Sequence, residues 1–159
     1  MRHIALLALA LAAPALAQPA PAPRAPARAE APIVAEARAF MAAYARDLLA
    51  GDRAAIAARY DRRGAWRVGG GQKTFERWTD IRDHYAGPDW TPPARFAWID
   101  LDYEAVGPNA VVVVGLFGWG IGGGGGTVIL SYTALLVRQG RALRIRLEDE
   151  SRAPIPVAH

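Results

Sequence analysis

From residue 99 onward the sequence reads as strand after strand with no helical pattern between them, and this limits the fold more than any other feature. The strand segments cover residues 99–104, 111–117, 128–137 and 143–150. Strands that follow one another through short turns pair antiparallel. In the last segment Leu143, Ile145, Leu147 and Asp149 alternate with charged residues, so we expect one face of the sheet to be buried and the other to be wet.

Helical patterns precede these strands. They cover residues 33–50, 53–60 and 75–85, with a short strand at 65–68 and a glycine turn at 69–71. Gly51 is typical of a helix end and Asp52 of the N-cap of the next helix. This order predicts an α+β fold in which three N-terminal helices pack on an antiparallel sheet that folds over them.

The N-terminal residues predict export. A short basic start leads into an apolar run that ends in Ala15-Leu16-Ala17, as in a cleaved signal peptide over residues 1–17. The run is too short to cross about 30 Å of hydrocarbon as a helix, although an uncleaved anchor is the alternative. Residues 18–32 alternate proline with alanine and predict a disordered lead. We therefore expect one domain at 33–152, a flexible tail at 153–159, and a periplasmic or secreted protein.

Composition excludes several kinds of site. The chain has no cysteine and three scattered histidines, so neither a thiolate site nor a multi-histidine metal centre can form. Arginines are interspersed with acids, which argues against a nucleic-acid surface. We expect no metal, no cofactor and no stable membrane insertion after signal removal.

Two glycine-rich segments resemble phosphate-binding motifs only in outline. Residues 118–123 match the dinucleotide pattern GxGxxG, but a strand pattern follows where the motif needs a helix. Residues 69–74 have glutamine where a phosphate loop needs glycine before Lys73. Both segments are interpreted as turns. Alternating acids at 100–104 share one strand face and are interpreted as a solvated surface.

Residues 44–52, Tyr-Ala-Arg-Asp-Leu-Leu-Ala-Gly-Asp, followed by Ile56 and Tyr60, resemble the first-helix pattern of the nuclear-transport-factor-2-like superfamily. Residues 131–133 and 144–151 are similar to the closing strands of its uncharacterised, exported bacterial branch, related to SnoaL-like and ketosteroid-isomerase-like proteins. The resemblance covers about residues 33–152. It implies a cone-shaped fold with a cup between the helices and a strongly curved sheet, and we expect a homodimer through that sheet.

Ketosteroid isomerases need an aspartate base and an oxyanion hole made of a tyrosine and a protonated aspartate. The resemblance implies that Tyr44 matches the tyrosine, whereas the base position falls at Val68 and the acid position at Thr133. Valine cannot transfer a proton and threonine is a poor substitute for a carboxylic acid. The isomerase mechanism is therefore not supported by the sequence.

Asp149 is the remaining candidate for catalysis, with Tyr44 as a hydrogen-bond donor. If Leu147 faces the cup, Asp149 does too, and desolvation by aromatic residues would make it a base. The alternative is an ion pair of Asp149 with Arg63 or Arg67. The candidate ligand-binding residues are Trp66, Trp78, Tyr60, Tyr85, Ser131, Thr133 and Leu147. The tryptophans could instead be core or dimer surface, and His84 is either a solvated helix-end histidine or an acid or base at the rim.

These observations lead to three hypotheses. The first is an exported module that binds a small, largely apolar molecule. The second is a cofactor-independent isomerase, cyclase or dehydratase that uses a pocket carboxylate. The third is an assembly module whose cup is filled by its own side chains.

Overall fold

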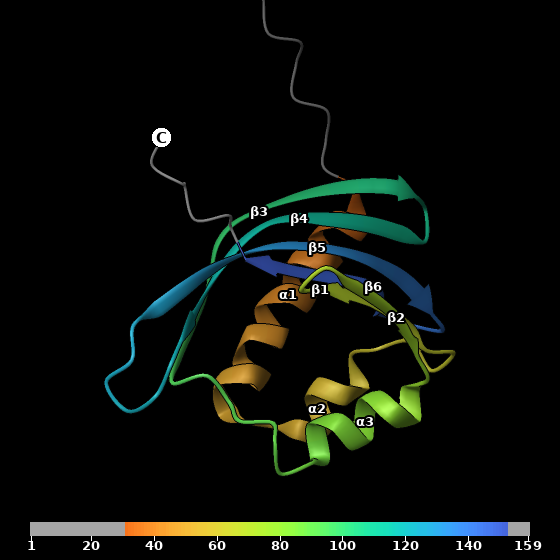
Figure 1. Cartoon of the computed structure of the whole chain (residues 1–159). Helices are drawn as coiled ribbons and strands as arrows, with labels where there is room; N and C mark the ends of the chain where they lie inside the picture. Colours follow the sequence, from red (N-terminus) through yellow and green to blue (C-terminus); the bar gives the residue numbers. More distant parts are fainter. Residues whose placement is uncertain (1–30, 153–159) are drawn as a thin grey trace, which may run out of the picture.

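The computed structural model describes residues 31–152, which form a sheet that curves over a layer of helices (Figure 1). The elements in chain order are α1 (Pro32–Ala50), α2 (Arg53–Ala58), β1 (Ala65–Gly69), β2 (Gln72–Glu76), α3 (Trp78–Ala86), β3 (Arg95–Gly107), β4 (Ala110–Gly120), β5 (Thr127–Gln139) and β6 (Ala142–Arg152). The signal at 1–17, nearly all of the lead at 18–32 and the tail at 153–159 lie outside the described residues.

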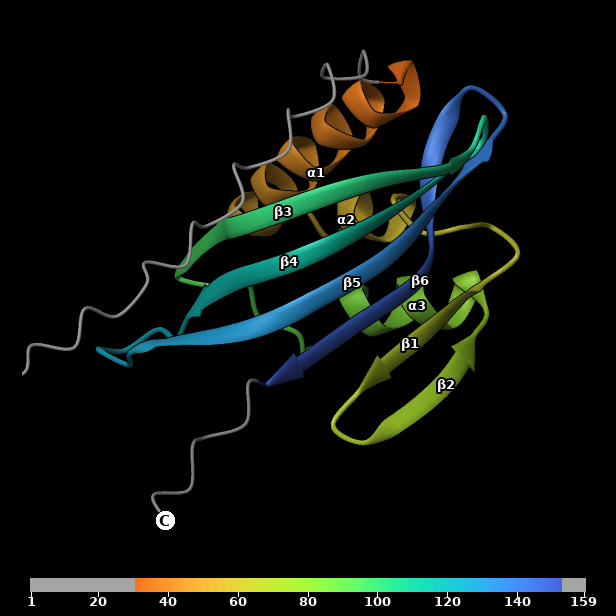
Figure 2. The same ribbon diagram turned by 90° about the horizontal axis from the view of Figure 1, so that it is seen from above.

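The sheet has six strands in the order β2-β1-β6-β5-β4-β3, as seen from above in Figure 2. Strands β3 to β6 pair antiparallel, as the sequence predicts, but β1 pairs with β6 in parallel. The expectation of an antiparallel sheet is therefore wrong, and the sheet is mixed. The reason lies in the segment before β1: the backbone N–H of Asp61 donates to the carbonyl of Ile145, and the N–H of Ile145 donates to that of Arg59. These bonds start β1 beside the beginning of β6, so both strands run the same way.

The third helix begins later than the sequence predicts. Residues 72–76 form β2, which pairs with β1 in a hairpin, and α3 starts at Trp78 rather than near residue 75. Gly70 and Gly71 form the hairpin turn with φ of 57° and 79°, a conformation that glycine adopts without steric cost. The three helices are consequently not consecutive, because the hairpin separates α2 from α3.

All three helices cover one face of the sheet, the concave one (Figure 1). The apolar stripe of α1, including Ala37 and Met41, is buried beneath β3 and β4. Helices α2 and α3 pack on each other, and Ile56 on α2 and Ile81 on α3 are both fully buried. The guanidinium of Arg53 in α2 holds the end of α3 by donating to the carbonyls of Tyr85 and Gly87 at 2.8 and 2.5 Å.

A β-bulge in β6 decides which residues of this strand face the helices. Leu147 pairs with Leu135, but Ile145 pairs with the next residue, Leu136, so Arg146 is an extra residue in the ladder. An extra residue reverses the alternation of side chains beyond it. Ile145 and Glu148 are buried on the helix side, whereas Leu147 and Asp149 lie on the outer face. The prediction that Leu147 and Asp149 share the face of Ile145 is wrong for this reason.

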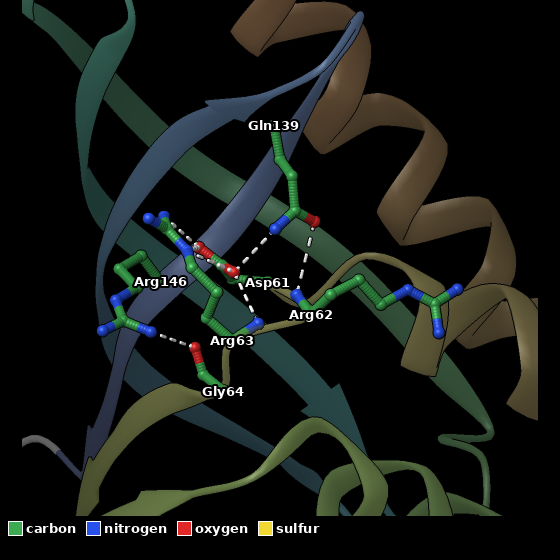
Figure 3. Close-up of polar contacts among 6 residues, drawn as sticks. All are labelled: Asp61, Arg62, Arg63, Gly64, Gln139 and Arg146. Atoms are coloured by element: carbon green, nitrogen blue, oxygen red, sulfur yellow. Dashed lines mark hydrogen bonds and ion pairs between the residues drawn. The ribbon is translucent and has the colours of Figure 1, made fainter.

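The loop between α2 and β1 is fixed by the fully buried carboxylate of Asp61 (Figure 3). Asp61 accepts hydrogen bonds from the guanidinium and backbone N–H of Arg63 and from the amide of Gln139 at the β5–β6 turn. Arg146, the bulge residue, donates to the carbonyl of Gly64 at 2.6 Å. Burial alone would raise the pKa of Asp61, but the hydrogen bonds from Arg63 outweigh it and hold this pKa below its ordinary value. The cluster thus ties the start of β1 to the start of β6.

Candidate functional site

A buried glutamate lies among four tyrosines between the helices and the sheet. Glu148 on β6 is 2% exposed and accepts hydrogen bonds from Tyr132 at 3.0 Å, from Tyr44 at 3.4 Å and from Tyr60. The hydroxyl of Tyr85 lies 2.9 Å from that of Tyr60. We call these five residues the tyrosine cluster. It joins α1, α3, β5, β6 and the segment after α2 at one point.

The phenols of the tyrosine cluster stay protonated. Burial, and then the charge of Glu148, raise the pKa of Tyr44, Tyr60, Tyr85 and Tyr132 above the ordinary value. Tyr44 is brought together with Tyr60 and Tyr85, as the predicted site requires, but the hydroxyl of Tyr44 is directed to Tyr60 and Glu148. All four tyrosines are buried, and their hydrogen bonds through Glu148 hold α1, α3 and the segment after α2 against β5 and β6.

An apolar hollow with a volume of about 330 Å³ lies against β4, β5 and β6. Its wall consists of Phe117, Trp119, Ile121, Val128, Leu130 and Glu150. Phe96 packs edge-on against Trp119, with ring centroids 6.1 Å apart, and so supports the tryptophan ring. Glu150 is the only ionisable group in this wall.

A second hollow, of about 400 Å³, lies between the β1–β2 hairpin, α3 and β6. Its lining is polar and includes Arg67, Glu76, His84 and Glu150. Burial alone would lower the pKa of the Arg67 guanidinium, but nearby tyrosines and carboxylates raise it, so Arg67 is always charged. Burial and the charge of Arg67 lower the pKa of His84, so its imidazole is mostly neutral at pH 7.

Glu150 therefore forms part of both walls. Burial, and then the neighbouring Glu148, raise the pKa of Glu150 to about 8 against the opposing effect of Arg67. The carboxyl is mostly protonated at pH 7 and can donate a hydrogen bond. A carboxyl with a pKa this close to neutrality is also suited to proton transfer.

Several predicted ligand-binding residues gather on one face, but it is the outer face of the sheet. Trp66, Ser131, Thr133 and Leu147 lie there together with Asp149. Trp66 packs edge-on against Phe75 at 5.4 Å. The hydroxyl of Ser131 donates to the carbonyl of Ser151, whose own hydroxyl donates to Asp149 at 2.7 Å. The structure does not bring these residues to the cup.

The two arginines that the sequence offered as ion-pair partners of Asp149 lie next to other carboxylates. Arg63 pairs with Asp61, and Arg67 lies nearest to Glu76, at 3.7 Å. The indole N–H of Trp78 donates to the carbonyl of Ala57 at 3.0 Å, and its ring is covered by Arg62 at 3.6 Å, so Trp78 joins α2 to α3.

Sequence reasoning missed Glu150, Arg67 and the apolar wall formed by Phe117, Trp119 and Leu130. The alternation in β6 assigned Glu148 and Glu150 to the wet face, and no residue type marks the bulge that moves them inward. Among residues 31–152, no three histidine or carboxylate side chains gather in a way that could hold a metal ion. Within the same residues, no helix is both long and apolar enough to cross a membrane.

Known structures with the same fold are numerous, but their sequences are distant. An NTF-2-like protein of unknown function from Shewanella oneidensis superposes with a TM-score of 0.65 at 13% identity, covering 75% of this chain and 98% of that one. A ketosteroid isomerase-like protein from Erwinia carotovora gives a TM-score of 0.60 at 14% identity, over 78% and 98% of the two chains. The CamKII hub homology domain of Chlamydomonas reinhardtii gives 0.62 at 16%, over 76% and 98%.

The chain has the nuclear-transport-factor-2-like fold. The resemblance derived from residues 44–60 and from the closing strands is confirmed at the level of the fold. No family model matches the sequence, and no curated protein matches it either. Val68 and Thr133, at the two isomerase positions implied by the resemblance, both lie on strands beside the outward-facing Asp149, with which each is paired.

Proposed function

We propose that this domain binds a small, largely apolar molecule in the apolar hollow. The observation that carries the proposal is an aromatic and aliphatic wall interrupted by a single ionisable group, Glu150. Ligand sites typically combine an apolar lining with few polar groups and have volumes of about 300–1,000 Å³. A hollow of about 330 Å³ suits a molecule of two or three fused rings. The third hypothesis, an assembly module whose cup is filled by its own side chains, is not favoured because the apolar hollow is open.

Binding is tested with 2-naphthol as the probe, by thermal shift and by quenching of tryptophan fluorescence, since Trp119 lies in the wall. Leu130→Trp fills the hollow and should abolish binding. Leu49→Trp is the matched control, because it makes the same substitution at a leucine of α1 that is 48% exposed and does not line the hollow. Binding that survives Leu130→Trp, or that both variants remove equally, would contradict the proposal.

A second candidate function is cofactor-independent proton transfer, as in an isomerase, cyclase or dehydratase. The observation that favours it is Glu150, whose pKa of about 8 suits a general acid or base. Glu150 takes the role that the sequence suggested for Asp149, because Asp149 lies on the outer face.

Proton transfer is tested with 2-tetralone, a two-ring ketone with acidic C–H bonds beside its carbonyl. Enolisation in D₂O replaces these hydrogens by deuterium, which NMR detects. Catalysis by Glu150 predicts exchange above the buffer rate that Glu150→Gln abolishes while binding persists. Exchange at the buffer rate, or equal exchange by the variant, would leave the binding module as the function.

We also propose that the protein forms a homodimer through the outer face of the sheet. Ile99, Val114, Leu116 and Ile129 on β3, β4 and β5 are 53%, 48%, 38% and 41% exposed. Ile99 and Ile129 lie on either side of Gly118, where an added Cβ would be within 4.0 Å of both. Exposed apolar side chains that adjoin in this way are typical of protein interfaces. Sedimentation should give a dimer, and Leu116→Glu a monomer; a wild-type monomer would contradict the proposal.

Export to the periplasm or medium is likewise a proposal, and it rests on residues 1–17. Expression of the full chain in a bacterial host should give a mature protein that begins at Gln18 in the periplasmic or secreted fraction. An intact N-terminus in the cytoplasm would refute it.

A further inference from the structure

We propose that the two hollows beside Glu150 form one amphipathic site, whose ligand has an apolar ring body and an oxygen acceptor, a carbonyl or a carboxylate, bound by Arg67. This inference rests on the proposed function, since it assigns the body of the ligand to the apolar hollow. It adds a polar subsite and a class of head group.

The two hollows meet at one residue. Glu150 lines the apolar hollow together with Phe117, Trp119 and Leu130, and it lines the polar hollow together with Arg67 and His84. The backbone of β1 approaches Glu150 closely, because a Cβ at Gly69 would lie 2.9 Å from the carbonyl oxygen of Glu150. A ligand that passes the carboxyl of Glu150 therefore extends from an apolar environment into a polar one.

Arg67 is suited to bind the head group because its donors are available. Its side chain is 26% exposed, and the nearest carboxylate oxygen, on Glu76, is 3.7 Å away. A charge-assisted hydrogen bond is about 2.7–2.9 Å long, so this contact is an ion pair without a hydrogen bond. Among the contacts of residues 31–152, none is a hydrogen bond of the Arg67 guanidinium, and its central carbon lies 5.9 Å from the centroid of the Tyr85 ring. The guanidinium thus presents unused N–H groups to the polar hollow.

The charges around the polar hollow favour an acceptor over a donor. Arg67 is cationic and Glu150 is protonated at neutral pH, so both present hydrogens. His84 is mostly neutral and provides one N–H. Glu76 is the one other carboxyl in this wall, and its distance from Arg67 leaves room for the fork of the guanidinium to bind an oxygen. A cationic head would face Arg67 directly and is therefore excluded.

The test compares three probes that share a two-ring body: naphthalene, 2-naphthamide and 2-naphthoate. Their affinities for the full chain are measured at pH 7 by fluorescence. We expect the wild-type protein to bind at least one of the two acceptor probes about 10-fold or more tightly than naphthalene, as one good hydrogen bond to a charged donor implies. A preference for naphthoate over naphthamide identifies a carboxylate head, and equal affinities identify a neutral carbonyl.

Arg67→Gln should reduce the affinity for the acceptor probes to that for naphthalene, while naphthalene binding stays unchanged. Arg67→Lys, which keeps the charge and loses the planar fork, should retain part of the preference. Lys73→Gln is the matched control: Lys73 lies opposite Val68 on the adjacent strand of the hairpin, is exposed, and does not line the hollow. Far-UV circular dichroism verifies that each variant is folded.

The outcomes separate this inference from the proposed function. If naphthalene binds and Leu130→Trp abolishes its binding, but the acceptor probes bind no better, the apolar hollow stands and the polar subsite is refuted. If Arg67→Gln and Lys73→Gln have equal effects, Arg67 has no specific role and the inference is likewise refuted. If none of the three probes binds, both proposals fail together.

Discussion

The raised pKa of Glu150 should make the stability of the protein depend on pH. Replacing it by glutamine keeps the shape of the side chain and removes its titration. In the folded protein the pKa of Glu150 is about 8, against an ordinary value of 4.5. The folded state thus holds this proton more tightly than the unfolded state does, so the free energy of unfolding falls as the pH rises from about 4.5 to about 8. Glu150→Gln has no such loss.

The magnitude follows from the two pKa values. For one group with these values, the wild-type protein loses about 3 kcal/mol between pH 5 and pH 8 relative to the glutamine variant. Partial contact of Glu150 with water in the two hollows reduces this to about 2–3 kcal/mol. For a domain of this size the difference in Tm between variant and wild type should grow by roughly 8–12 °C over that pH range.

Differential scanning calorimetry at several pH values from 5 to 8 measures the effect. The variant should be close to the wild type at pH 5 and clearly more stable at pH 8. Asp149→Asn removes the adjacent carboxyl on the outer face and should leave the wild-type fall in stability in place. A constant Tm difference between Glu150→Gln and wild type across this range would show that Glu150 is not desolvated, and the account of the site would fail.

Three further predictions concern the framework of the cup. Tyr132→Phe removes one donor to the buried Glu148 and should lower the free energy of unfolding by about 1–3 kcal/mol in urea denaturation. Asp61→Asn removes a carboxylate whose pKa is lowered by Arg63. The ionised carboxylate of Asp61 stabilises the folded protein above about pH 4, and this stabilisation is lost as the pH falls through the pKa of Asp61 in the folded state. The variant should therefore show a smaller loss of Tm in acid than the wild type. Gly115→Ala places a methyl carbon 1.8 Å from a backbone oxygen of β3 and should destabilise by about 1–3 kcal/mol or prevent folding, with Gly70→Ala at the exposed hairpin turn as a milder comparison.

The sequence by itself determined most of the helices and strands, with β2 as the exception. Helical periodicity gave α1, the Gly51-Asp52 pair placed its end, and alternation gave four successive strands in nearly the observed positions. These signals are local: they depend on the spacing of apolar residues and on the preferences of glycine and aspartate at helix ends. The resemblance added Tyr44 as a candidate site residue beside the candidate ligand-binding residues Tyr60 and Tyr85, and the structure links the three hydroxyls through Tyr60.

Only the tertiary structure decided which residues face the cup. One extra residue, Arg146, reverses the alternation in β6, and so exchanges Leu147 and Asp149 for Glu148 and Glu150 on the concave face. The parallel pairing of β1 with β6 depends on backbone bonds between segments more than 80 residues apart, from Arg59 and Asp61 to Ile145. No local sequence pattern predicts the bulge or the parallel pairing, because both are fixed by the packing of the whole sheet on its helices. Local sequence patterns therefore predict most of the helices and strands. The register of the strands decides which side chains line the concave face, and so decides the chemistry available there.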